Sequence, residues 1–173
     1  MADTMRTYGD AMAEYTRGIA VDWKELTRYL DFNDLPAALA EVHGDLDQDQ
    51  LARGLRDAWT RTNPASRTTV DRTQWLKWFR AVGYIEGDRR VDPPRRLKLY
   101  RGAPDPNGMS WTSDINVAKF FRHSWRGRLW TTTVGHRRLL AHFPRSVSLD
   151  GSGLVESEYI IDPTGLRPRE IRG

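Results

Sequence analysis

Cysteine is missing from this sequence of 173 residues, which excludes a disulfide framework and a thiolate-bound zinc site. No apolar run is long enough to span a bilayer, so we expect no membrane partner or membrane-spanning segment. The N-terminal stretch MADTMRTYGDAMAEYTRG has no basic segment leading into an apolar core, so it predicts no secretory signal. These absences favour a protein of the cytoplasm, either that of its own cell or that of a host or target cell.

Metal-ligand spacing is also lacking. His123, His136 and His142 form no ligand pattern with one another or with carboxylates, so we expect no metal. The chain is not expected to be disordered, because seven tryptophans in a sequence of this length argue for a packed core.

Charge is distributed unevenly along the chain. Residues 1–90 hold 13 basic and 15 acidic side chains, a net charge of −2, whereas residues 91–173 hold 14 basic and 8 acidic side chains, a net charge of +6. Twelve of those 14 basic residues are arginine. Because arginine pairs with phosphates and carboxylates through a planar fork, the second half favours an anionic ligand such as a nucleotide, a nucleic acid or an acidic partner.

The first half, residues 1–90, is expected to be helical. VDRTQWLKWFRAVGY (70–84) and DQDQLARGLRDAWTR (47–61) carry tryptophan, leucine and phenylalanine at helical spacing behind acidic starts. Shorter helices are expected near 5–17, 22–31 and 34–43. The proline pair in EGDRRVDPPRR (86–96) breaks the pattern and marks a linker or an element boundary.

The second half, residues 91–173, changes to short β-prone runs separated by glycine, proline and aspartate. One helix, DINVAKFFRHSW (114–125), interrupts these runs, and Asp114 is its expected N-cap. We therefore expect an α+β chain with a helical region over 1–90 packed on a mainly antiparallel β-rich region over 91–173, the two forming one compact unit.

Three short motifs follow one another in the β-rich region. Tyr100-Arg101-Gly102 ends a predicted strand, Ser110-Trp111-Thr112-Ser113 forms another directly before the helix, and Glu156-Ser157-Glu158 opens a third. Residues i and i+2 of a strand point to the same face, so Glu156 and Glu158 bring two like charges together. A solvated strand face is the ordinary explanation for such a pair.

In this order, LYRG, SWTSDINVAKFF and ESEYIID resemble the arginine strand, the serine strand with its helix, and the E-x-E strand of the arginine–serine–glutamate class of mono-ADP-ribosyltransferases. That class includes cholera-toxin-like and actin-modifying toxins and several bacteriophage enzymes. The resemblance covers residues 97–172, and we know of no equivalent pattern over residues 1–90. It implies a small β-sandwich fold, with NAD as the substrate and no metal.

The resemblance also implies roles on the NAD side of the site. Arg101 would offer its fork to phosphate or ribose oxygens, and the main chain of Gly102 would grip the nicotinamide carboxamide. The usual pattern is Ser-Thr-Ser; aligning the following helix on Asp114 makes Ser110 its first position and Thr112 its third, with Ser113 as the competing register. Ser110 would steady the catalytic glutamate by hydrogen bonding, and Trp111 departs from the pattern and is expected in the core.

Glu158 would be the catalytic carboxylate, bonded to the ribose 2′-hydroxyl beside the carbon where positive charge develops. Glu156 would orient and deprotonate the incoming nucleophile, and two glutamates in this pattern favour a protein arginine as acceptor. Phe120 and Phe121 could stack on nicotinamide, although residues at this helical spacing beside Ala118 are more often part of a core.

Three other interpretations stay open. The same site could hydrolyse NAD, with water as the acceptor, or the protein could be a degenerate transferase retained for binding. Alternatively, the arginines could contact phosphates in a basic module that binds nucleic acid or the ribosome, although no familiar nucleic-acid-binding motif is visible.

Overall fold

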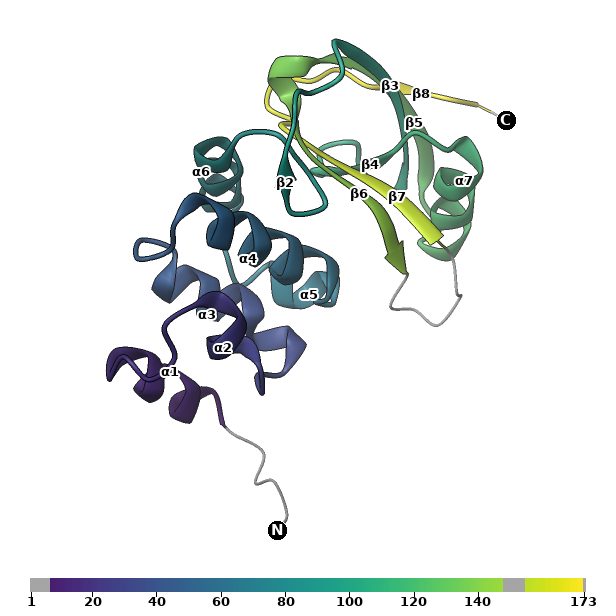
Figure 1. Ribbon diagram of the computed structural model, residues 1–173. Coiled ribbons are helices and arrows are strands. Elements are labelled where there is room, and N and C mark those ends of the chain that lie inside the picture. The colour runs from purple at the N-terminus through teal and green to yellow at the C-terminus, as the bar shows by residue number, and fades with distance from the viewer. Residues whose placement is uncertain (1–6, 148–154, 173) are drawn as a thin grey trace. The chain divides into compact units, whose positions relative to one another are not determined.

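The computed structural model describes residues 7–147 and 155–172, except for the side chains of 145–147, 155 and 156. In this range it contains seven α-helices and an eight-stranded, mostly antiparallel sheet (Figure 1). The chain divides into two compact units between Val82 and Gly83. Among the described residues, no helix is both long enough and apolar enough to cross a membrane.

The first unit is helical, as the sequence predicts. Its helices are α1 (Tyr8–Thr16), α2 (Trp23–Thr27), α3 (Leu35–Val42), α4 (Gln48–Thr60), α5 (Pro64–Arg67) and α6 (Arg72–Val82), with a 3₁₀ turn, η1 (Phe32–Asp34), before α3. Asp22, Asp47 and Asn63 cap α2, α4 and α5 by accepting a main-chain N–H of the first turn. The short helix α5 was not predicted, although Asn63-Pro64 is a recognisable helix start.

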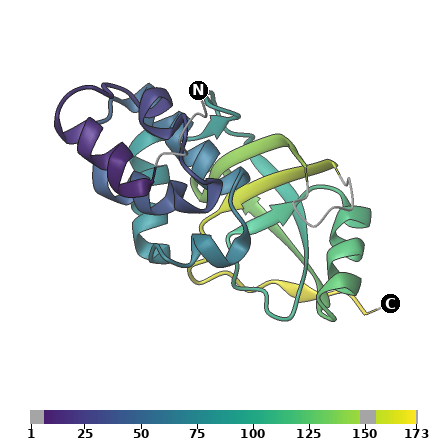
Figure 2. The same ribbon diagram turned by 90° about the horizontal axis from the view of Figure 1, so that it is seen from below.

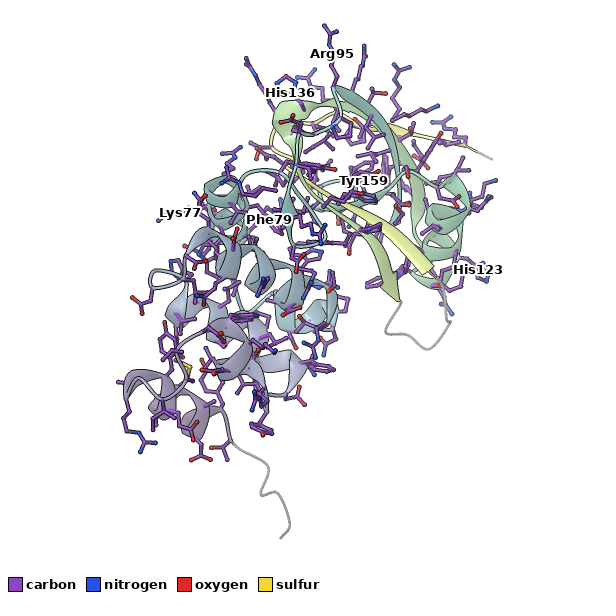
Figure 3. The ribbon with its side chains drawn as sticks, viewed as in Figure 1. Lys77, Phe79, Arg95, His123, His136 and Tyr159 are labelled. Carbon is purple, nitrogen blue, oxygen red and sulfur yellow. The ribbon has the colours of Figure 1, made fainter. Side chains whose placement is uncertain are left out.

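Aromatic rings fill the core of the first unit. Trp59 meets Trp75 edge to face at 5.1 Å between ring centroids, and Trp75 meets Trp78 in the same way at 5.3 Å. On α6, Phe79 is fully buried while Lys77 is exposed (Figure 3). The helical spacing of the tryptophans was therefore that of a core face.

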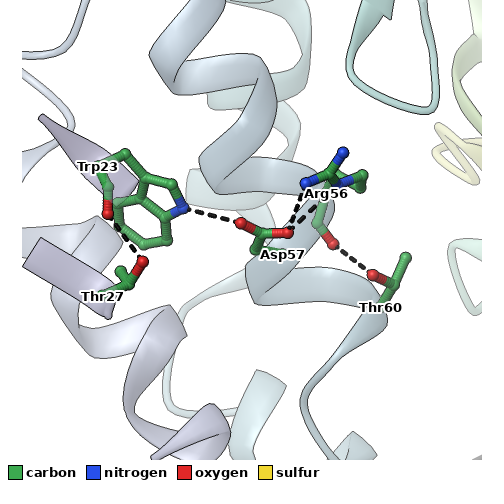
Figure 4. Close-up of polar contacts among 5 residues, drawn as sticks. All are labelled: Trp23, Thr27, Arg56, Asp57 and Thr60. Carbon is green, nitrogen blue, oxygen red and sulfur yellow. Dashed lines mark hydrogen bonds and ion pairs between the residues drawn. The ribbon is translucent and has the colours of Figure 1, made fainter. Parts of the chain in front are cut away.

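One charged group lies inside this helical core. Asp57 on α4 is 8% exposed and accepts a hydrogen bond from Trp23 Nε1 at 3.1 Å, while Arg56 contacts its other oxygen at 2.9 Å (Figure 4). The bond joins α2 to α4 across 34 residues of sequence. A buried carboxylate needs such partners, because leaving it unpaired would cost several kcal/mol of desolvation.

The second unit is built on one sheet. Its strands are β1 (Ile85–Glu86), β2 (Arg89–Arg90), β3 (Arg96–Ala103), β4 (Ser110–Thr112), β5 (Arg128–Gly135), β6 (Leu139–Val147), β7 (Val155–Ile161) and β8 (Arg169–Glu170), and its helices are α7 (Ile115–Ser124) and the 3₁₀ turn η2 (His136–Arg138). The strand order is β2-β1-β6-β7-β4-β3-β5-β8, with β1 and β6 the parallel pair. The mainly antiparallel sheet agrees with the prediction, whereas the two sheets of a sandwich do not appear separately among the described strands.

Residues 85–90 differ from the prediction, which placed them in the helical region and its linker. They form the hairpin β1–β2, in which Glu86 pairs with Arg89 around Gly87-Asp88, and Gly87 has a φ of +64°. A two-residue turn with a positive φ matches the twist of paired strands. The hairpin signal was present in the sequence but was hidden by the surrounding charges.

The sheet bends around its own core. Five buried residues cluster there, one from each of the five longest strands, namely Leu99, Trp111, Val134, Leu139 and Ile161. Val134 on β5 and Leu139 on β6 belong to strands four places apart in the sheet, so a flat sheet could not bring them together. Helix α7 packs on β3 (Figures 1 and 2). It lies on the side of Gly102, which strand alternation places opposite Leu99.

Asp57→Ala is expected to lower the free energy of unfolding of the helical unit by about 1–3 kcal/mol, because Trp23 Nε1 would lose its buried acceptor. Urea unfolding followed by tryptophan fluorescence measures this loss. In a Trp23→Phe background, where the donor is already gone, Asp57→Ala should cost clearly less. Equal costs in the two backgrounds would show that the hydrogen bond contributes nothing.

Candidate functional site

Strand β4 brings the three sequence motifs together, because it lies between β3 and β7 in the sheet. Thr112 pairs with Tyr100 of β3 on one side and with Glu158 of β7 on the other. Motifs that are separated by 9 to 48 residues along the chain are therefore joined by side-chain bonds.

Ser110 contacts Glu158 directly. Its hydroxyl donates a hydrogen bond to Glu158 Oε1, and Glu158 is only 5% exposed while Ser110 is half-buried. The competing Ser113 instead shares a hydrogen bond with the Tyr159 hydroxyl. Because Tyr159 and Glu158 are adjacent in a strand, they point to opposite faces. The hydroxyl that meets the acid is therefore that of Ser110.

Trp111 turns away from this pair. It is 2% exposed, belongs to the core cluster inside the bend of the sheet, and donates from Nε1 to the Gly108 carbonyl at 2.8 Å. The predicted core position of Trp111 is confirmed. Its place between Ser110 and Thr112 follows from strand alternation, which leaves the middle residue for the opposite face.

Arg101 also contacts Ser110, at the main chain of the serine. Its Nη1 donates to the Ser110 carbonyl at 2.7 Å and its Nε donates to the Asp105 carbonyl at 3.2 Å. The strand register starts its side chain on the face of Trp111, and the long stem then brings the guanidinium against the β4 main chain. Arg101 and Glu158 thus both contact Ser110, one at the main chain and one at the hydroxyl.

The turn between β3 and β4 shapes the space for this guanidinium. A Cβ built on Gly108 would lie 2.2 Å from Arg101 Nη2, so a glycine leaves the room that the arginine occupies. Asp105 closes the turn by accepting the Asn107 N–H at 2.8 Å. Asp105 and Gly108 were missed as positioning residues, although their Asp-Pro-Asn-Gly sequence is a clear turn signal.

Gly102 has a structural reason to be a glycine. A Cβ at this position would lie 1.9 Å from the Ala118 carbonyl oxygen and 2.3 Å from the Arg122 main-chain nitrogen, so the absence of a side chain lets α7 approach β3. The space beside its Cα is therefore taken by the helix. The main chain of Gly102 was expected to contact a ligand, and the close approach of α7 explains the glycine without one.

Thr112 and Phe121 serve the start and the body of α7. Thr112 is 6% exposed and its hydroxyl accepts the Asp114 N–H at 3.1 Å, while Asp114 caps the helix by accepting the Asn116 N–H, as predicted. Phe121 is half-buried and packs edge to face on Phe120 at 5.5 Å between centroids. The contacts that place these two residues are thus within or next to the helix.

Glu156 lies on β7 opposite Ser146 of β6, and its side chain is outside the described residues. The pairing shifts here, because Phe143 pairs with Glu158 and three steps along β6 correspond to two along β7. Such a bulge bends a strand and re-aims its side chains, and bulges are frequent beside active sites.

Positive charge surrounds this sheet but its groups are mostly surface residues. Arg95 and His136 lie side by side at one end of the sheet, where the His136 N–H donates to the Arg95 carbonyl at 3.3 Å (Figure 3). Arg128 on β5 contacts Glu170 on β8 at 3.4 Å. Within the described part of the chain, no three histidine or acidic side chains are grouped so as to hold a metal ion.

Comparison of the chain with protein-family models, with curated proteins and with solved structures finds no match.

Gly102→Ala is expected to destabilise the second unit by about 1–3 kcal/mol, the usual range for an overpacked site, because its methyl group would collide with the α7 main chain. Gly135→Ala is the matched control on the neighbouring strand β5: the nearest atom to its Cβ is 3.9 Å away and its φ is −88°. Thermal unfolding of the two variants compares them. A Gly102→Ala protein as stable as Gly135→Ala would contradict the close contact.

Proposed function

We propose that the protein is a mono-ADP-ribosyltransferase, which breaks the bond between nicotinamide and ribose in NAD and transfers ADP-ribose to an arginine of a target protein. The observation that carries the proposal is the Ser110 hydroxyl bonded to Glu158, with Arg101 bonded to the Ser110 carbonyl. Residues of the three separate motifs are thus joined through Ser110, and the bond between its hydroxyl and Glu158 is the one that the resemblance implies.

The reaction gives this arrangement its chemical meaning. Cleavage of an N-glycosidic bond builds positive charge on the ribose, as in glycoside hydrolysis, and a fixed negative charge beside that carbon stabilises the transition state. A carboxylate at 5% exposure exerts its charge through little water, which strengthens the effect. Ser110 would hold one oxygen of Glu158 and so fix the direction of the other toward the ribose 2′-hydroxyl.

Arg101 would serve the anionic end of NAD while its two main-chain bonds hold the guanidinium in place. A guanidinium carries five N–H donors, so a group fixed by protein carbonyls can also be presented to phosphate oxygens. The half-buried Gly102 and Ser110 lie next to Arg101 in the structure and would form the adjoining edge of the site.

Glu156 would act on the acceptor. Arginine is protonated at neutral pH, so a carboxylate near the reacting guanidinium would orient it and help to remove its proton. Glu156 is two residues from Glu158 on one strand, which is the spacing that places both acids on one face. The bent, mostly antiparallel sheet would correspond to the small β-sandwich that the resemblance implies.

Glu158→Gln is expected to reduce both nicotinamide release and protein labelling by about 100-fold or more, because the developing cation would lose its counter-charge. The measurement uses labelled NAD, purified full-length protein and a cell lysate. Glu156→Gln should suppress protein labelling but retain part of the NAD hydrolysis. Unchanged labelling by Glu158→Gln would refute the assigned mechanism.

The same assay separates transfer from hydrolysis. Nicotinamide release that requires the lysate indicates transfer to a protein, whereas equal release with and without lysate indicates an NAD glycohydrolase. Mass spectrometry of the labelled peptides then identifies the acceptor residue.

Ser110→Ala is expected to lower nicotinamide release by about 10- to 100-fold, since a hydrogen bond to a charged group contributes about 1.5–3 kcal/mol. Ser113→Ala is its control: the two changes are chemically identical, but Ser113 bonds Tyr159. Ser113→Ala should retain most of the activity. A larger loss in Ser113→Ala than in Ser110→Ala would reverse the assignment.

A further inference from the structure

Three side chains form a row on the face of β7 opposite Glu158. Glu86 comes from β1, His142 from β6 and Ser157 from β7, which are neighbouring strands of the sheet. Glu86 Oε1 lies 3.3 Å from His142 Nδ1, and His142 Nε2 lies 2.8 Å from Ser157 Oγ. The imidazole thus joins an acid on one side to a hydroxyl on the other.

The ring of His142 is fixed in this direction by stacking. It lies on the Tyr159 ring at 4.1 Å between centroids and 5° between planes, and Tyr159 is held in turn by Ser113. The parallel pairing of Glu86 with His142 places the acid beside the ring. Each member of the row is therefore positioned by the sheet and by a contact of its own.

The protonation state follows from these contacts. Glu86 can only accept, so the Nδ1 of neutral His142 carries the hydrogen and Nε2 is left as the acceptor for the Ser157 hydroxyl. Burial lowers the pKa of His142 below its ordinary value, against the opposing effect of the Glu86 carboxylate. A neutral imidazole with a free electron pair at Nε2 is the form that can act as a base.

An acid, a histidine and a hydroxyl bonded in this order are the components of nucleophilic catalysis. We propose that Glu86, His142 and Ser157 form a relay that makes Ser157 a nucleophile toward activated acyl and phosphonyl groups. This activity would be separate from the proposed reaction with NAD, because it uses the opposite face of β7.

The step conserves atoms and charge. Ser157 Oγ bonds to the carbonyl carbon of an ester while its proton passes to His142 Nε2, and Glu86 stabilises the imidazolium. The bond to the leaving alkoxide then breaks, and Nε2 returns the proton to it. Water, activated by the same nitrogen, hydrolyses the acyl-serine and regenerates the hydroxyl. With a fluorophosphonate, fluoride leaves and the serine keeps the phosphonyl group.

The surroundings suit a small, aromatic ester. Ser157 and Tyr159 are half-buried, and Glu86 is 51% exposed, so the row is open on its Glu86 side. Tyr84 packs with Tyr159 against the core cluster and adds a second ring. Burial raises the pKa of both phenols, with Glu86 acting in the same direction, so they stay neutral and apolar beside the row.

The test is labelling of the full-length protein with a reporter fluorophosphonate, followed by peptide mass spectrometry. We expect the adduct on Ser157 and none on Ser124, an exposed serine of α7 that serves as the internal control. Ser157→Ala should abolish the label. His142→Gln should slow it by about 100-fold, the usual contribution of a general base.

Glu86→Gln keeps the proposal testable if His142→Gln fails to fold, because Glu86 lies at the surface. It should slow labelling by about tenfold or more, since the orienting acid stabilises the imidazolium. Circular dichroism of each variant checks its fold. The absence of an adduct on Ser157, equal labelling of Ser124, or an unchanged rate in Glu86→Gln would overturn the proposal.

Discussion

A carboxylate at 5% exposure inside a sheet is the constraint around which the second unit is arranged. Taking Glu158 out of water costs several kcal/mol unless donors replace the lost hydration. The Ser110 hydroxyl supplies one donor, and it can do so only if β4 lies next to β7 in the observed register. The hydrogen bond therefore ties side-chain chemistry to strand pairing, because a slip of one residue would turn Ser110 to the opposite face.

The three residues of β4 divide their work between the two faces of the sheet. Ser110 and Thr112 share the face of Glu158, while Trp111 enters the core cluster on the inner side of the bend. Arg101 starts from the inner face and reaches β4 through a gap that Gly108 leaves open. The site thus depends on the three-residue strand β4. Trp111 anchors this strand in the core, while Ser110 and Thr112 lie on the face of Glu158.

Local signals explain what the sequence could predict. Helix starts at Asp47 and Asp114, the aromatic face of α6 and the inward turn of Trp111 all follow from spacing of a few residues. Aligning the helix that begins after Asp114 favoured Ser110 over Ser113, and in the structure Ser110 is the serine that contacts Glu158. The reason for Gly102 could not be predicted, because it depends on how closely a helix 16 residues away in sequence packs on the strand.

The row formed by Glu86, His142 and Ser157 could not be predicted from the sequence, for a further reason. It requires β1 to pair in parallel with β6, which brings Glu86 beside a residue 56 positions later. The β1–β2 hairpin that supplies Glu86 was itself hidden in a charged stretch expected to be a linker. No spacing along the chain reveals such a group, and in the sequence His142 could only be compared with metal-ligand patterns.

Because side chains alternate along β7, the two groups of polar side chains lie on opposite faces of this strand. Glu158 faces Ser110 on one side, while Ser157 and Tyr159 face His142 on the other. The two sides still share a support, because Ser113 follows β4 directly and holds Tyr159, on which His142 stacks. A displacement of β4 would therefore disturb both faces together, whereas a change confined to one side chain should disturb only its own. That difference makes the two groups separable by single substitutions although they share one strand.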